Sequence, residues 1–403
     1  MTTTLRLASL LTALVLGLTA CGGGDGQGEE GAAGSEGGGG GEPIVVGGIF
    51  DLTGPTGDVG TPYADGVKDY VDFLNGSGGI EGRDFDLRSQ DYQYDVAVAE
   101  QLYSQYTGAG AVSILGWGTA DTEALRGRVA SDELPYFSGS LSEELADPAE
   151  TPYNFLVGTT YSDQMRIALK QIAEETPDAE IAVFHNDSPF GESPLADGEA
   201  YISEQGLDLG YETYPMPTGA TDFVSQLSQA KQQGATHIIV QNVASPAAQL
   251  ASDIASQDLD VEMWCLNWCT DELFIELAGD AAEGVRGVTP WAPATIDAEG
   301  LAELDEYLSE NGSSVQDKGA HYVQGWYYAK LMAEAIANVI RNGDEVTGPN
   351  IKTTLEEMEA FDTGGVSPPV DFSAESHKGM TAAPTFEVSD GTWTPSSDGP
   401  VEP

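Results

Sequence analysis

Short apolar runs alternate with amphipathic stretches along most of this chain. The first run, Ile44 to Phe50, is uninterrupted and rich in β-branched residues, and the turn-forming sequence Asp51 to Gly57 follows it directly. Thr61-Pro62 then opens a stretch with Tyr63, Val67, Tyr70, Val71 and Leu74 on one side and aspartates on the other. The pattern predicts a buried strand, a loop and a helix. In a parallel α/β sheet such a loop lies at the carboxyl end of its strand and faces a crevice, so we expect one wall of a binding site there.

The strand and helix pattern recurs in two series. The first series contains expected strands over 85–88, 111–115, 135–137 and 153–157, and helices over 96–106 and from Asp121 or Thr122 through Ala130. The second series begins at Ile181, after a helix over 163–174 that Ser162 can cap. Its expected strands are 181–185, 207–213, 237–240 and 262–266, with helices over 222–233 and 246–257. Two such series predict an α/β fold with two doubly wound sheets.

The last third of the chain adds further elements. Gly284 to Trp291 is expected to be extended, and 298–309 to be helical. The longest helix candidate, Gly319 to Arg341, has Tyr322 and Trp326 on an apolar stripe, so we expect both rings in the core. Alternation over 372–393 predicts a β-hairpin that turns at Ser389-Asp390-Gly391.

Length and charge narrow the class of protein. A chain of 403 residues is long enough for two lobes with separate cores. Its 66 acidic and 15 basic residues give a net charge of −51, and so acidic a surface repels nucleic-acid phosphates. We read the acidic surface as a solubilising shell and expect no nucleic-acid partner.

The N-terminus predicts export. An uncharged apolar run from Leu7 to Ala20 follows Arg6, and it is too short to span a bilayer, as in a secretory signal peptide. Leu18-Thr19-Ala20-Cys21 resembles the lipobox of bacterial lipoproteins. We therefore expect a signal peptide over 1–20, a lipidated Cys21, and a flexible glycine-rich linker through residue 43. The alternative is a simple signal peptide with an incidental cysteine.

The sequence offers little for catalysis or metal binding. The four histidines are scattered, and none lies in a hydrolase, zinc or phosphate-loop motif. His237 begins a buried strand and is expected to be structural. Cys265 and Cys269 could form a small-loop disulfide outside the cytoplasm or stay as thiols, but they lack the partners of a zinc site. We predict no enzyme, no cofactor and no metal.

Several motifs together resemble one family. The lipobox, the strand 44–50 and four short sequences occur in the order and spacing typical of the extracellular solute-binding proteins of branched-chain amino acid ABC transporters; the four sequences are Leu52-Thr53-Gly54-Pro55, Asn75 to Ile80, Phe190-Gly191 and Ala278 to Gly284. The resemblance covers about residues 44–393. It implies a type I periplasmic-binding-protein fold, in which two lobes joined by three crossovers close on a ligand. The crossovers are expected near 158–159, 287–288 and 364–369.

The resemblance also implies an organisation and partners. Lobe 1 would comprise 44–158 plus 288–365, and lobe 2 would comprise 159–287 plus 366–403. The protein would be lipid-anchored on the outer side of the cell membrane and deliver a small organic solute to permease and ATPase subunits. Two other functions stay open, namely a sensor module of the same fold and an extracellular hydrolase.

The family's ligand site maps onto particular positions here. Its carboxylate-binding group corresponds to Thr119 and the backbone from Ser138 through Gly139 and Ser140 to Leu141. Positions of the family's aromatic wall fall on Val59, Phe190 and Val243, and a threonine and an acid that hold the amino acid fall on Leu141 and Asn267. Thr53, Trp117, Gly118, Tyr161 and Trp268 complete the expected site, although Trp117 and Trp268 could instead pack the lobes together.

The departures at Leu141 and Asn267 bear on the ligand. A desolvated ammonium needs an anion or several acceptors, and Asn267 offers only a neutral carbonyl. We therefore expect a small apolar or aromatic carboxylate or amide in place of a plain α-amino acid. If the alignment is shifted by a few positions, Asp271 or Glu272 would instead supply the ammonium partner.

Overall fold

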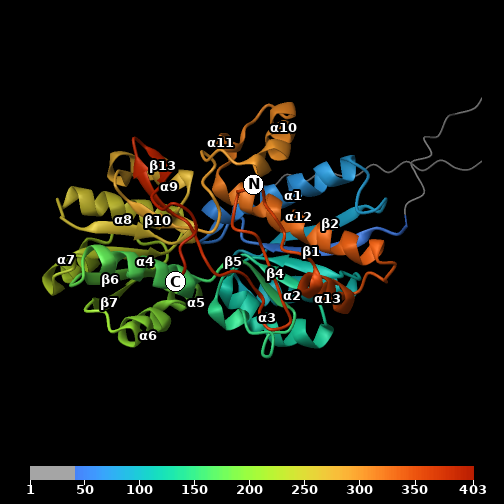
Figure 1. Ribbon diagram of the computed structural model, residues 1–403, viewed down its shortest axis with the longest axis horizontal. Helices are drawn as coiled ribbons and strands as arrows, with labels where there is room; N and C mark the ends of the chain where they lie inside the picture. Colours follow the sequence, from blue (N-terminus) through green and yellow to red (C-terminus); the bar gives the residue numbers. More distant parts are fainter. Residues whose placement is uncertain (1–40) are drawn as a thin grey trace, which may run out of the picture. The chain divides into compact units, whose positions relative to one another are not determined.

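A computed structural model describes residues 41–403 as two sheets flanked by helices (Figure 1). The predicted signal peptide, Cys21 and most of the linker lie outside the described residues. Within the described residues, no helix combines the length and hydropathy that crossing a bilayer requires.

The first sheet is entirely parallel, with the strand order β11-β5-β4-β3-β1-β2. Its strands are β1 (Ile44–Phe50), β2 (Phe85–Asp91), β3 (Ser113–Gly116), β4 (Tyr136–Ser138), β5 (Asn154–Thr159) and β11 (Lys378–Met380). The helices that follow its first three strands are α1 (Gly57–Gly76), α2 (Val96–Gly108) and α3 (Thr119–Asp132).

The second sheet has the order β13-β12-β10-β9-β8-β6-β7 and is parallel from β10 to β7. Its strands are β6 (Glu180–Asn186), β7 (Gly210–Met216), β8 (His237–Gln241), β9 (Glu262–Cys265), β10 (Arg286–Val288), β12 (Thr385–Ser389) and β13 (Thr392–Pro395). Its helices are α4 (Tyr161–Glu175), α5 (Pro189–Glu192), α6 (Leu195–Gln205), α7 (Val224–Gln233), α8 (Ala244–Ser256) and α9 (Glu272–Ala278). Two parallel-sheet lobes confirm the predicted fold class.

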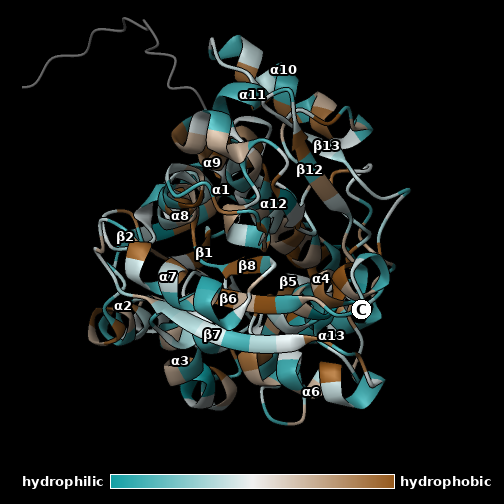
Figure 2. Cartoon of the chain, turned by 90° about the vertical axis from the view of Figure 1, so that its left-hand side faces the viewer, coloured by the Kyte–Doolittle hydropathy of each residue, from teal (hydrophilic) through white to brown (hydrophobic). Residues whose placement is uncertain are grey.

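Four helices lie between β10 and β11, namely α10 (Ala302–Glu310), α11 (Val315–Lys318), α12 (Ala320–Arg341) and α13 (Gly348–Glu357). In Figure 1, the orange α12 runs beside the blue α1 in the half that holds the first sheet. Tyr322 and Trp326 are 0% and 1% exposed, so their predicted core position is confirmed. Hydrophobic residues gather on the inner strands, whereas hydrophilic residues predominate on the outer helices (Figure 2).

The chain passes between the sheets three times. The first passage follows β5 and the second follows β10, as expected, but the third follows β11. β11 pairs with β5, so residues 378–380 belong to the first sheet, although 366–403 was expected in lobe 2. Continuous alternation over 372–393 concealed this break, and only β12 and β13 form the predicted hairpin, which turns at Asp390 and Gly391. The other lobe boundaries stay a prediction.

Three helix starts differ from the prediction. α1 begins at Gly57, ahead of Pro62, and α3 begins at Thr119, ahead of Asp121. α4 is capped by Thr160, whose Oγ1 accepts a hydrogen bond from the Asp163 N–H, and Ser162 lies inside the helix. In each case loop geometry starts the helix before the residue that the pattern favoured.

His237 has the structural role that was predicted. Its ring is 4% exposed, and its Nδ1 lies 2.9 Å from the Thr236 hydroxyl. Residues 41–403 contain no group of three or more His, Cys, Asp or Glu side chains that could hold a metal ion.

Candidate functional site

A small hollow lies where the carboxyl ends of strands from both sheets meet. Loops after β1, β2 and β3 supply one side, and the start of α4 and the segments after β6, β8 and β9 supply the other. Its volume is about 10 Å³, room for about one water molecule. The lining residues are Thr56, Tyr94, Trp117, Gly118 and Thr119 on the first side and Tyr161, Phe190, Val243 and Trp268 on the second.

The first wall is held by the loop after β1. The buried Asp51 carboxylate accepts hydrogen bonds from the N–H groups of Gly54 and Thr56 and from the Thr56 hydroxyl. Thr56 Oγ1 in turn accepts the indole N–H of Trp117 at 2.8 Å. The loop that was expected to form one wall therefore does line the hollow, through Thr56.

Hydroxyl groups surround one end of the hollow. Thr119 Oγ1 lies 2.6 Å from Ser140 Oγ, and the Tyr161 hydroxyl accepts the Trp268 indole N–H at 2.8 Å. Thr119 is also the first residue of α3, so the free N–H groups of that helix face the same end. Burial raises the pKa of Tyr161, which keeps this hydroxyl neutral. Such a set of neutral donors suits a carboxylate or an amide oxygen.

Aromatic rings form the remainder of the lining. The rings of Trp117 and Trp268 are 4.7 Å apart, and they come from opposite sides of the hollow. Tyr161 and Phe190 meet edge to face at 5.4 Å. Trp117 and Trp268 therefore pack the two sides together and also line the hollow, and their contact with a ligand stays a prediction.

Seven residues of the predicted site line the hollow: Trp117, Gly118, Thr119, Tyr161, Phe190, Val243 and Trp268. Four others lie directly behind them. Ser140 contacts Thr119, Leu141 accepts the Tyr161 N–H through its carbonyl, Ser138 Oγ lies 3.4 Å from the Trp117 carbonyl oxygen, and Gly139 packs so closely on the Trp117 ring that a Cβ would lie 2.9 Å from it.

Three predicted residues do not line the hollow. Thr53 is an exposed part of the loop and donates its hydroxyl to Asp91, whereas Val59 is buried inside the core. The Asn267 side chain points to the segment after β10, where its Oδ1 accepts the Thr289 hydroxyl at 2.9 Å. Its backbone N–H donates to the side-chain oxygen of Gln164 at 2.9 Å.

Thr56 and Tyr94 line the hollow but were missed. Thr56 lies in the loop that the sequence singled out, so only the choice of residue was wrong. Tyr94 follows Gln93, and both have left-handed backbone angles, with φ of 59° and 56°. A left-handed backbone conformation is rare in residues other than glycine. Apolar periodicity therefore gives no signal for this turn.

The two carboxylates that could have replaced the missing ammonium partner are used elsewhere. Asp271 Oδ1 caps α9 by accepting the Phe274 N–H, and the Asp271 carboxylate faces His321 at 3.4 Å. Glu272 accepts the N–H groups of Ala294 and Ala320. Neither residue lines the hollow, whose lining contains no charged side chain.

Cys265 and Cys269 are two buried thiols, so the disulfide considered from the sequence is not formed. Cys269 Sγ lies 3.6 Å from the Val240 carbonyl oxygen, to which it donates, and this directs the thiol toward β8. Burial raises the pKa of the Cys265 thiol, and the adjacent Cys269 thiol raises it further.

Comparison with known proteins decides the family. The family model described as "Periplasmic binding protein" matches residues 43–392. The chain belongs to this family. The family is one of binding and transport proteins and implies a location outside the cytoplasm.

Individual relatives share about a quarter of their aligned residues with this chain or fewer. The chain is 27% identical over 209 residues to Leu/Ile/Val-binding protein homolog 7 of Brucella melitensis, a match that covers 49% of this chain and 51% of the relative. It thus spans about half the length of that relative. Leu/Ile/Val-binding protein homolog 1 of Brucella abortus is 22% identical over 324 residues, which cover 79% of this chain and 84% of the relative.

Solved structures match nearly the whole fold. A branched-chain amino acid ABC transporter protein from Thermus thermophilus with bound valine has a TM-score of 0.85 and 26% identity, and the match covers 91% of this chain and 97% of that one. An ABC transporter substrate-binding protein from Aeropyrum pernix has a TM-score of 0.80 and 26% identity, covering 90% and 96%. A fatty acid ABC transporter substrate-binding protein from Thermomonospora curvata, at 20% identity and a TM-score of 0.81, shares the fold.

Proposed function

We propose that this protein is the solute-binding component of an ABC transporter and closes its lobes on a small organic solute. The hollow carries this proposal, because nine residues from two lobes meet there and two tryptophans contact each other across it. A ligand that touches both sides binds the closed state better than the open one, and so it shifts the equilibrium toward closure. The transport and binding roles named for the Thermus and Brucella proteins support the same role.

We infer that the solute has a carboxylate or amide at one end and an apolar or aromatic body. Thr119 and the start of α3 would hold the polar end, and Phe190, Val243 and the tryptophans would hold the body. An α-amino acid would bring an ammonium into a lining without a charged side chain, where burial of an unpaired charge costs several kcal/mol. A hollow of one-water size also means that the lobes must part before the solute enters.

A thermal-shift screen tests the ligand class. The panel contains aromatic acids, short-chain acids, their amides, and amino acids including leucine and valine. A ligand at 100 times its Kd should stabilise the protein by roughly 2.7 kcal/mol. The acids or amides should give the largest shifts, and a larger shift with leucine or valine would show that the inferred class is wrong.

Thr119→Val tests the site itself. The change keeps the shape but removes the hydroxyl, so the affinity for the best ligand should fall about 10- to 100-fold, the range for a lost hydrogen bond to a charged group. Thr107→Val is the matched control, because Thr107 Oγ1 donates only to backbone carbonyls in α2 and Thr107 does not line the hollow. Equal affinities of the two variants by titration calorimetry would place the ligand elsewhere.

The membrane anchor is a further part of the proposal. Cys21 would carry lipid, and residues 22–43 would tether the binding unit to the membrane. Mass spectrometry of the full-length protein expressed in bacteria should show a lipid-modified N-terminal cysteine that Cys21→Ser removes. An unmodified mature chain would overturn the anchor and leave solute binding in place.

A further inference from the structure

Asp121 is a buried acid directly behind the floor of the hollow. It lies in the first turn of α3 and is 1% exposed. Its Oδ1 accepts the Tyr92 hydroxyl at 2.8 Å, whereas its buried Oδ2 has no hydrogen-bond partner. Gly118 lines the hollow in front of Asp121. Only glycine fits at this position, because a Cβ there would lie 2.3 Å from Asp121 Oδ1.

The surroundings of Asp121 favour its neutral form. Burial raises the pKa of Asp121 to about 7, although the Tyr92 hydroxyl and the N–H groups of Gly118 and Asp121 lower it, and the nearby Asp51 carboxylate raises it further. The other titratable groups that face it are Tyr94 and Tyr136, both with pKa values raised by burial. Close to neutral pH, then, a proton is readily gained or lost at Asp121.

The position of this acid conflicts with the proposed ligand. The start of α3 is the place where we put the ligand carboxylate, and an ionised Asp121 would set a second negative charge at the same helix end. Two carboxylates so close in a buried site do not both ionise, and one of them keeps a proton.

We propose that Asp121 determines specificity at this site, so that a carboxylate ligand binds together with one proton. The proton comes from solvent and is held on Oδ2 of Asp121, the oxygen without a partner, so the site gains no net charge from the pair. A neutral amide needs no such proton. The inference rests on the proposed function, because it assumes that the polar end of the solute lies at Thr119.

If Asp121 had only a structural role, the pH dependence of benzoate binding would not change when its carboxylate is replaced. An acid at this helix position often accepts the N–H of the capping residue, and here the Gly118 N–H faces the carboxylate. Asparagine offers the same acceptor oxygen, so Asp121→Asn keeps the cap and removes only the titration. The variant therefore separates the two roles.

The experiment compares benzoate with benzamide, by titration calorimetry between about pH 6 and pH 8.5. In the native protein, the Kd of benzoate should rise about tenfold for each pH unit above 7, and the Kd of benzamide should stay constant. Near pH 8, buffers of different ionisation enthalpy should reveal uptake of close to one proton with benzoate and none with benzamide.

Asp121→Asn should bind benzoate with a Kd that is constant within about twofold over the same range. Asp132→Asn is the control, because Asp132 ends the same helix and also accepts a tyrosine hydroxyl, from Tyr103 at 3.1 Å. This control should keep the native pH dependence.

The outcomes separate the inference from the proposed function. A benzoate Kd without pH dependence in the native protein, or an unchanged dependence in Asp121→Asn, overturns the proton coupling alone. Binding of benzamide without any binding of benzoate, at every pH, also overturns the coupling and leaves solute binding in place. No binding of either compound at any pH overturns the coupling, and the proposed function is overturned with it only when no compound of the thermal-shift panel binds.

Discussion

Single buried side chains decide which residues reach the hollow. The Asp51 carboxylate is 0% exposed, and both of its oxygens accept hydrogen bonds from the loop that carries Thr56. Thr56 then fixes the Trp117 indole, which packs against Trp268 from the other lobe. One carboxylate thus orients a chain of contacts that ends at the opposite side of the site. Charge-assisted hydrogen bonds of this kind are stronger than neutral ones, which suits them to hold a loop in place.

The family resemblance predicted residues of the site that lie close to strand ends. Thr119, Phe190 and Val243 each lie two to four residues after a strand, at the edge of the sheet where the hollow is found. Tyr94 could not be found in this way, because a left-handed turn aims its ring. Asn267 also lies just after a strand, but its side chain bonds to Thr289 away from the hollow, and no one-dimensional pattern contains that partner.

At the scale of elements, the closest helix pair is α1 with α12. An added Cβ at Gly66 would lie 2.0 Å from the Tyr322 carbonyl oxygen, and one at Gly325 would lie 1.9 Å from the Tyr63 carbonyl oxygen. Each helix thus places a glycine against the backbone of the other. Such an approach leaves no space for a side chain, and the backbones would have to separate.

Gly66→Ala should therefore destabilise the protein by about 1–3 kcal/mol, the usual range for overpacking, as measured by urea denaturation. Gly76→Ala in the same helix is the control, because no atom lies within 4 Å of its added Cβ. Alanine has the higher helix propensity, so this control should be neutral or slightly stabilising. Equal stability of Gly66→Ala and the native protein would contradict the close contact.

Long elements were predicted better than short ones. The helix over 319–341 agrees with α12 within one residue at its start, since more than five turns of one stripe give a clear period. α9 has seven residues, too few for a period, and was missed, whereas β11, with three, was predicted only as part of the hairpin over 372–393 and belongs to the other sheet. α13 was also missed, although Thr347 and a proline in its first turn are the residues that begin helices.

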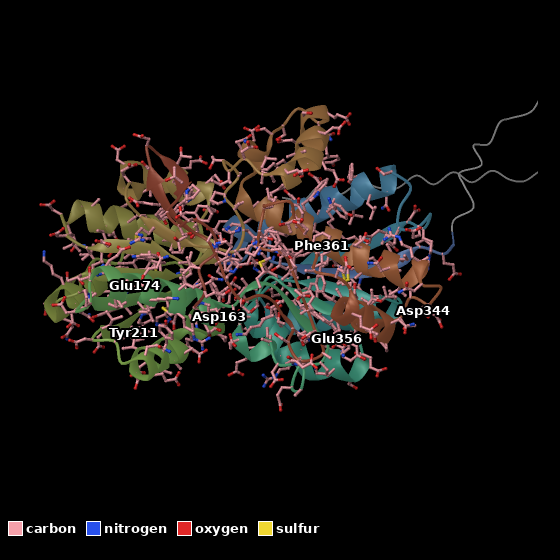
Figure 3. All side chains as sticks on the ribbon, in the orientation of Figure 1. Asp163, Glu174, Tyr211, Asp344, Glu356 and Phe361 are labelled. Atoms are coloured by element: carbon pink, nitrogen blue, oxygen red, sulfur yellow. The ribbon has the colours of Figure 1, made fainter. Side chains whose placement is uncertain are left out.

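At the scale of the whole described unit, ion pairs and hydrogen bonds join the lobes near their crossovers. Lys378 in β11 lies 3.0 Å from Asp163 in α4 and also contacts Glu143 in the first lobe. Figure 3 places Asp163 between the halves of the molecule. The Lys378 side chain is only 20% exposed, so this link is more than a solvated surface pair. It joins elements that pivot about each other if the lobes open.

A second link lies two residues along the chain from the lining residues Thr56 and Val243, and it bears on closure. Asp58 in the first turn of α1 accepts the backbone N–H of Ser245 in the first turn of α8, at 3.0 Å. α1 belongs to the first lobe and α8 to the second, so this hydrogen bond exists only while these two helix ends are together. The α8 cap makes no side-chain hydrogen bond of its own, so the Asp58 carboxylate also satisfies a free N–H of that helix.

Asp58→Ala should weaken closure without damaging either lobe. The loss of a hydrogen bond to a partly exposed carboxylate, about 1 kcal/mol, should raise the Kd of the best ligand about fivefold. Asp65→Ala is the control, because Asp65 lies on the same helix and pairs only with Lys68, three residues away. Calorimetry gives the two Kd values, and small-angle X-ray scattering should show a larger radius of gyration for ligand-free Asp58→Ala than for the control. If both variants bind with the native Kd, this contact does not contribute to closure, and the aromatic contacts across the hollow hold the lobes together without it.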